Sequence, residues 1–137
     1  KELRVWIVFL RPLGLRLKEE VQRLVRNAII RAMKKVAGEY LPPLLDALAE
    51  HYGLSYKRVK ITGSKGRWGS CSAAGSINLS CYLMLLPSHL MDYVLLHELS
   101  HTKEMNHGPR FWELLDSMTE GRAHLLRAEL RQFNTDF

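Results

Sequence analysis

Apolar residues recur at different spacings along the chain, and the change of spacing separates helical from strand-like parts. From Leu17 to Tyr40 they recur every three to four positions between Lys, Arg and Glu residues, which predicts a long amphipathic helix. Pro42-Pro43 is expected to interrupt it, and Leu44 to Tyr52 predicts a second, short helix that ends at Gly53. The apolar run from Leu3 to Leu10 predicts a buried strand before these helices. The first half of the chain is therefore expected to be mainly helical.

The middle of the chain has the pattern of strands and the rest returns to helices. Basic and apolar residues alternate from Tyr56 to Ile61, four glycines follow, and Ser76 to Leu79 again resembles a strand, so a small antiparallel sheet is expected. Ser88 is suited to be the N-cap of a helix that runs to about Met105. Further helices are expected from Pro109 through Leu115 and from about Gly121 to Phe133. These elements predict an α+β fold.

Composition refines this interpretation mainly by exclusion. Of the 137 residues, 47% are apolar and 25% are charged, as in ordinary globular proteins, which excludes a disordered or fibrous class. A chain of this length can bury its own core, so one domain over residues 1–137 is expected. No apolar run approaches the roughly 20 residues of a membrane-spanning helix, and no membrane partner is expected. Two cysteines, Cys71 and Cys81, are too few for a disulfide scaffold, which favours a reducing cytoplasm.

The chain is basic, with a formal net charge of +6 at pH 7. Such a balance is compatible with an anionic partner, nucleic acid included. The Lys and Arg residues are, however, dispersed along the whole sequence, and solvated helix faces explain dispersed charges better than a dedicated nucleic-acid surface does. The charge alone therefore leaves a nucleic-acid partner as an alternative.

The residues from His97 to His101 spell His-Glu-Leu-Ser-His, an HExxH motif. Residues four apart lie on one face of a helix, so His97 and His101 can bind the same zinc ion. Glu98 then projects beside the metal, where it can act as the general base toward a bound water. The apolar segment from Ser88 to Leu96 is expected to carry the motif on a buried helix.

A catalytic zinc needs a third protein ligand, and two residues compete for this role. His107 lies six positions after His101, which is the offset in the pattern HExxHxxGxxH. Glu104 occupies the glycine position of that pattern, so the chain is expected to turn later, with Asn106 in the left-handed conformation. Glu120 is the alternative ligand, but the place of His107 beside a helix break favours His107. The other histidines are expected to be ordinary surface or packing residues: His51, His89 and His124.

Together with its surroundings, the motif resembles the YgjP-like metallopeptidases of the zincin superfamily, which are related to SprT-like and WLM domains. The resemblance covers Lys57 to Trp112 and implies a zincin-like fold with the HExxH helix beside a short sheet, Zn²⁺ as the cofactor and His107 as the third ligand. The matching residues are Arg67-Trp68-Gly69-Ser70-Cys71-Ser72, Ile77-Asn78-Leu79, Asp92-Tyr93-Val94, His97 to His101 and Asn106-His107-Gly108-Pro109-Arg110-Phe111-Trp112.

Other residues of the matching set are expected to support the site rather than to react. Trp68 is interpreted as a packing residue, Gly69 as a turn or a place of close approach, and Cys71 as a small buried thiol without a nucleophilic role. Phe111 and Trp112 are expected to anchor the helix that follows His107 and so to hold His107 in place.

The predicted function is zinc-dependent hydrolysis of peptides or proteins, in which Glu98 takes a proton from water and passes it to the leaving amine. Tyr93 and Arg110 are the candidates for a donor that stabilises the oxyanion. A sheet edge at Ile77 to Leu79 is expected to bind an extended peptide by strand addition.

Two alternatives involve nucleic acid: a nucleic-acid-associated protein with a structural zinc, and a protease that processes DNA-linked proteins. Structural zinc sites usually close all four positions, often with cysteines, whereas three histidines and a base favour an open site. A zincin that binds peptides without cutting them is disfavoured, because Glu98 is intact.

Overall fold

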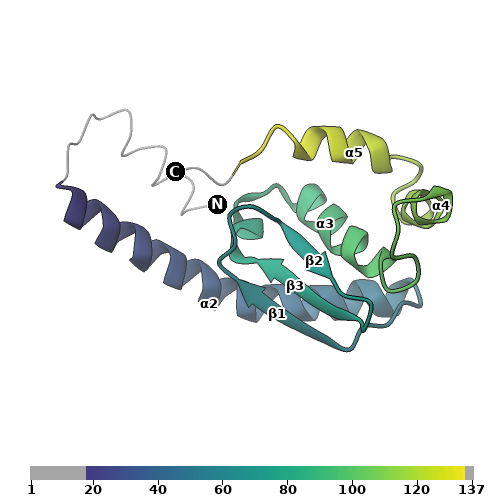
Figure 1. Cartoon of the computed structure of the whole chain (residues 1–137), viewed down its shortest axis with the longest axis horizontal. Helices are drawn as coiled ribbons and strands as arrows, with labels where there is room; N and C mark the ends of the chain where they lie inside the picture. Colours follow the sequence, from purple (N-terminus) through teal and green to yellow (C-terminus); the bar gives the residue numbers. More distant parts are fainter. Residues whose placement is uncertain (1–17, 135–137) are drawn as a thin grey trace.

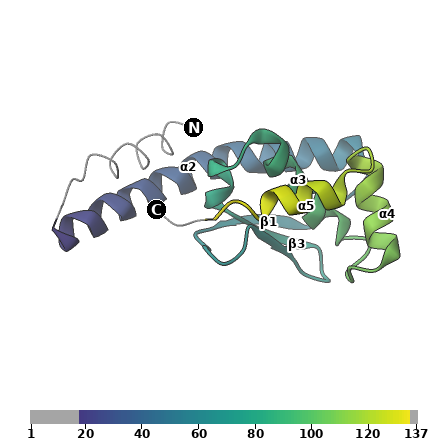
Figure 2. The ribbon, with the colours of Figure 1, turned by 90° about the horizontal axis from the view of Figure 1, so that it is seen from above.

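The computed structural model describes residues 18–134 of the chain, so the predicted strand from Leu3 to Leu10 lies outside the described residues. Figure 1 shows a small sheet in front of helix α2 (Glu19–His51), with helix α3 (Ser88–Ser100) above the sheet and helix α5 (Ala123–Leu130) above α3. Figure 2, seen from above, shows α2 behind the sheet and α5 over α3. Within residues 18–134, no helix has the length and apolar character needed to cross a membrane. This layered arrangement confirms the predicted α+β class.

Helix α2, Glu19–His51, is a single helix of 33 residues. The predicted break at Pro42-Pro43 is wrong, because both prolines lie inside it. A proline inside a helix costs about 3 kcal/mol. The buried positions of α2 recur every four residues. Burial of a Met or Leu side chain stabilises the fold by roughly 1.5–3 kcal/mol, so the three that are fully buried, Met33, Leu41 and Leu45, together match the cost of the two prolines. The buried residues are Met33, Ala37, Leu41, Leu45 and Ala49.

The sheet contains strands β1 (Arg58–Thr62), β2 (Gly69–Cys71) and β3 (Ser76–Ser80) in the order β1-β3-β2. The predicted antiparallel pairing is right for β2 and β3 and wrong for β1, which pairs with β3 in parallel. The tight turn at Gly75, with φ of +86°, reverses the chain after β2 and returns it to a point opposite the start of β1. β3 is therefore the central strand, and the predicted edge at Ile77 to Leu79 is wrong.

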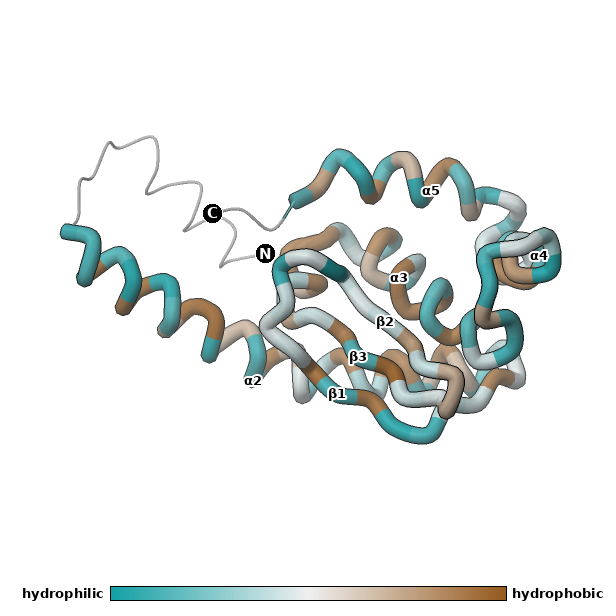
Figure 3. The backbone as a smooth tube through the Cα atoms, in the orientation of Figure 1, coloured by the Kyte–Doolittle hydropathy of each residue, from teal (hydrophilic) through white to brown (hydrophobic). Residues whose placement is uncertain are grey.

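Helix α3, Ser88–Ser100, is the centre of the core: nine of its 13 residues are buried. Figure 3 accordingly shows α3 as a mainly apolar segment. The predicted N-cap Ser88 is instead the first helical residue, preceded by Pro87. The helix also ends before the predicted Met105, because the Thr102 hydroxyl donates to the carbonyl oxygen of Leu99 at 2.6 Å and the chain tightens into a turn.

The remaining elements are short. The 3-10 helix η1, Cys81–Leu85, joins β3 to the segment before α3. Helix α4, Pro109–Met118, begins with Pro109 in its first turn, as predicted, and helix α5, Ala123–Leu130, is shorter than the predicted segment. Gly53, with φ of +66°, follows α2 and confirms the predicted helix stop.

Candidate metal centre and active-site cleft

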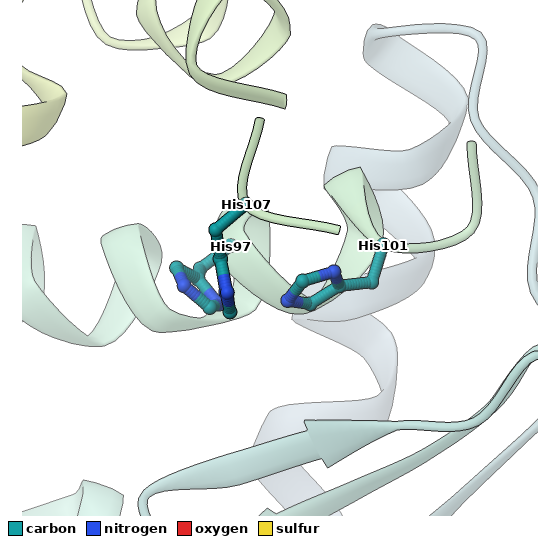
Figure 4. Close-up of side chains that lie close together, drawn as sticks. All are labelled: His97, His101 and His107. Atoms are coloured by element: carbon teal, nitrogen blue, oxygen red, sulfur yellow. The ribbon is translucent and has the colours of Figure 1, made fainter. Parts of the chain in front are cut away.

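His97, His101 and His107 lie together although they come from two parts of the chain. His97 and His101 are one turn apart at the end of α3, and His107 comes from the loop before α4 (Figure 4). Their candidate ligand atoms all lie within 4.8 Å of one another. Among the residues from 18 to 134, these three are the group of His, Cys, Asp and Glu side chains that could hold a metal ion.

The surroundings of His101 fit a metal ligand. Its Nδ1 lies 3.0 Å from the carbonyl oxygen of Glu104, so a hydrogen on Nδ1 is donated to that carbonyl and Nε2 is left to bind a metal. Burial lowers the pKa of His107, and the charges of His101 and His97 lower it further. A lowered pKa favours the neutral imidazole, which is the form that binds metals.

One phenylalanine touches all three imidazoles. Phe111 is fully buried on α4 and stacks on His101 with ring centroids 4.6 Å apart. It meets His97 and His107 edge to face, at centroid distances of 5.0 and 4.8 Å. This contact agrees with the supporting position expected for Phe111, since the ring fills the space behind the three histidines.

The histidines expected to have ordinary roles lie away from the three imidazoles. His124 stacks on Trp112 at 4.1 Å between ring centroids, and the Trp112 ring lies 6.4 Å from that of His107. His89 pairs with Glu129, with 2.6 Å between Nε2 and Oε2, and His51 meets the neighbouring Tyr52 ring edge to face.

Glu98 lies at the cleft with only 5% of its surface exposed. Its Oε2 is 3.3 Å from Nδ1 of His97. A β-carbon placed on Gly69 would lie 3.1 Å from Cγ of Glu98 and 3.1 Å from the carbonyl oxygen of Asn78. The close approach predicted at Gly69 is therefore confirmed, and the partner that approaches is Glu98.

Gly69→Ala is expected to lower kcat for peptide hydrolysis by about 10- to 100-fold while the chain still folds. The added methyl group must displace Glu98 or the β3 backbone by a few tenths of an ångström, and misplacement by 1 Å can cost about 100-fold in rate. The matched control is Gly66→Ala, because a β-carbon at Gly66 meets nothing within 4 Å. Steady-state kinetics and thermal melts of both variants check this, and equal kcat values for the two would contradict it.

The Cys71 thiol is half-buried at the cleft rather than fully buried as expected. Burial raises its pKa to about 11, and the nearby Glu98 carboxylate raises it as well. A thiol with a raised pKa stays protonated at neutral pH, and the thiol form is a poor nucleophile. This agrees with the expectation that Cys71 has no nucleophilic role.

The conformation predicted for Asn106 is wrong, and the alternative ligand Glu120 lies apart from the three histidines. Asn106 does not adopt positive φ: within the described residues, Glu120 is the non-glycine residue that does, with φ of +55°. Glu120 lies in the exposed turn between α4 and α5. It is neither part of the three-histidine group nor a lining residue of the cleft.

The two candidate oxyanion donors differ in position. Tyr93 lines the cleft one turn before His97, and its buried hydroxyl has no hydrogen-bond partner within the described part of the chain. Burial is the largest cause that raises the pKa of Tyr93 to about 12, so this phenol keeps its proton at neutral pH. Arg110 is exposed on α4 and does not line the cleft.

The far wall of the cleft comes from residues that the sequence analysis did not single out. Arg127 and Leu130 on α5, and Arg131 and Phe133 after it, line the same cleft as the three histidines. The pattern of α5 predicts a helix, but periodicity contains no signal for where that helix packs.

The buried HExxH helix, the sheet beside it and the three converging histidines define a metallopeptidase. Among solved structures, the metallopeptidase zymogen of Pyrococcus abyssi abylysin is 25% identical with a TM-score of 0.59, and the match covers 69% of this chain and 98% of that one. The metallopeptidase zymogen of Methanocaldococcus jannaschii jannalysin has a similar fold, at 21% identity and a TM-score of 0.57. The match covers 66% of this chain and 93% of that one.

The sequence itself gives the family. The model of the YgjP-like metallopeptidase domain matches residues 11–133, and the chain belongs to this family. No curated protein sequence matches the chain significantly. The zincin-like fold that the resemblance implied and the metallopeptidase class are therefore confirmed.

Proposed function

We propose that the chain is a zinc peptidase in which His97, His101 and His107 bind one Zn²⁺ ion and Glu98 is the general base. The observation that carries this proposal is the convergence of three imidazoles, with ligand atoms within 4.8 Å, beside a buried carboxylate in a cleft of about 600 Å³. Three histidine ligands leave one coordination position open, as in catalytic zinc sites. Imidazole ligands also suit zinc better than they suit magnesium or calcium.

Different residues of the chain have different roles in the proposed hydrolysis. When bound, zinc polarises a peptide carbonyl and makes water a stronger acid. Glu98 accepts a proton from the attacking water and delivers it to the leaving amine. Gly69 leaves the space in which the Glu98 carboxylate sits. The buried, unpartnered hydroxyl of Tyr93 is the donor best placed to move toward the developing oxyanion.

The edge strand β2 is the surface that we propose for the peptide backbone. β2 pairs with β3 on one side, and its residues Gly69, Ser70 and Cys71 line the cleft. An extended peptide that pairs with the free side of β2 would pass the three histidines, and the backbone hydrogen bonds would give affinity without sequence preference. This replaces the predicted edge at Ile77 to Leu79, which is the central strand.

Two expectations from the sequence, the cellular compartment and the number of domains, are part of this proposal. We place the enzyme in a reducing cytoplasm, because both cysteines of the chain, Cys71 and Cys81, are free thiols. We also retain one domain over residues 1–137 as the unit that carries the activity.

Metal analysis of protein purified without chelators tests the proposed function. We expect about one zinc per chain, hydrolysis of fluorescently labelled casein that stops after dialysis against EDTA, and recovery when zinc is added back. The same dialysis on protein supplied with excess zinc is the control. Protein that contains no zinc and gains no activity from added zinc would refute the assignment.

A further inference from the structure

Three arginine side chains line the cleft that holds the three histidines. Arg67 lies just before β2, Arg127 lies on α5, and Arg131 directly follows α5. All three are exposed. The acidic residue described in the same lining is Glu98, which we have assigned to catalysis. The rim of the cleft is therefore cationic.

The arginines lie on two walls of the cleft. Helix α3 contacts both β2 and α5, and Figure 1 shows α5 and β2 on opposite sides of α3. Arg67 belongs to the wall formed by β2, and Arg127 and Arg131 belong to the wall formed by α5. A peptide that lies along β2 would thus have a guanidinium group on either side.

Aromatic contacts orient Arg127. Its guanidinium carbon lies 5.7 Å from the ring centroid of Trp112, and Trp112 stacks on His124. The positive charges on the α5 wall act on groups inside the cleft. Burial raises the pKa of Tyr93, and the charges of Arg127 and Arg131 oppose that rise. Arg127 also lowers the pKa of His107, after burial and the neighbouring histidines.

No carboxylate within residues 18–134 forms an ion pair with these arginines. The pairs described there are His89 with Glu129 and His97 with Glu98. A guanidinium presents its donors in a rigid fork that matches a carboxylate, so an exposed arginine without a carboxylate partner is suited to bind the acid of a ligand.

We propose that this cleft selects peptides with Asp or Glu residues close to the scissile bond. The inference rests on the proposed peptidase function and adds its substrate class. A peptide fits better than nucleic acid does, because the arginines line a concave cleft together with apolar Leu130 and Phe133, and a cleft of about 600 Å³ does not admit a DNA duplex.

Three quenched fluorescent octapeptides test the preference. They share one central sequence and carry Glu, Gln or Lys at the two positions on each side of the scissile bond. We expect kcat/KM at low salt to be about tenfold higher for the Glu peptide than for the Lys peptide, because one exposed ion pair gives up to about fivefold and several act together. The ratio should fall as salt is added.

Arginine variants connect the preference to the cleft. In the double variant Arg127→Gln and Arg131→Gln, the ratio of Glu to Lys peptide should fall to about twofold. Arg67→Gln should also lower it, through the opposite wall. The matched control is Arg23→Gln, an exposed arginine on α2 that does not line the cleft and should leave the ratio unchanged.

The binding of fluorescein-labelled Glu and Lys peptides to Glu98→Gln separates this inference from the proposed function. Tighter binding of the Glu peptide that is lost in the double arginine variant supports the substrate class, whether or not any peptide is cleaved. Equal binding of the two peptides would overturn the inference, even if zinc-dependent hydrolysis is found.

Binding of a labelled DNA duplex to the wild type and to the double arginine variant tests nucleic acid as the competing partner. If the double arginine variant weakens duplex binding and the peptides show no charge preference, the arginine rim is a nucleic-acid surface and the inference is wrong. Duplex binding that the variant leaves unchanged agrees with it.

Discussion

Glu98→Gln is expected to lower peptide hydrolysis by at least about 100-fold while zinc content and fold are kept. General bases typically contribute about 10²- to 10⁴-fold to a rate, and the amide of Gln does not accept a proton from water at neutral pH. Gln has nearly the same shape as Glu, which matters because Glu98 is 5% exposed and meets Gly69 closely. Measurements of kcat/KM, bound zinc and the melting temperature check the three parts of this expectation.

The matched control for this variant is Glu113→Gln, which neutralises an exposed glutamate on α4 that does not line the cleft. It removes the same charge from the protein and should leave turnover at the wild-type level. Turnover by Glu98→Gln that equals turnover by Glu113→Gln would show that Glu98 is not the base.

Removal of any one of the three histidines is expected to cost more metal affinity than the loss of a nearby supporting residue. Loss of a residue that only supports a ligand weakens metal binding about 10- to 100-fold. We therefore expect His97→Ala, His101→Ala and His107→Ala each to lose zinc under mild chelation. The measurement is zinc content after dialysis against a graded series of EDTA concentrations.

Glu120→Ala is the decisive comparison for the third ligand. Glu120 lies in the exposed turn between α4 and α5, outside the cleft, so its variant should keep zinc at chelator concentrations that strip His107→Ala. The opposite order, with zinc lost from Glu120→Ala and kept by His107→Ala, would transfer the ligand role to Glu120.

The parts of the site that could be predicted from the sequence are those that local geometry determines. His97 and His101 share a helix face because they are four residues apart, and that spacing needs no tertiary information. His107 could be placed near them because only a short turn separates it from His101. Pro109 marked the start of α4 for an equally local reason, since a proline suits the first turn of a helix.

The parts that could not be predicted depend on contacts between distant segments. The helix α2 continues through Pro42-Pro43 because packing on the core offsets the local cost of the prolines, and residue patterns do not reveal that balance. Alternation predicts β1 but not its direction relative to β3. Arg127 and Arg131 lie about thirty residues after the HExxH motif, and only the packing of α5 on α3 brings them to the cleft.

The contact of Phe111 with all three imidazoles limits how this enzyme can change during evolution. The ring belongs at once to the hydrophobic core and to the wall behind the candidate ligands. A substitution that repacks α4 for greater thermal resistance therefore also shifts the imidazoles, and one that retunes the imidazoles loosens the core. Because most proteins lie only slightly above the stability they need, changes at this position should be tolerated mainly when second substitutions compensate for them.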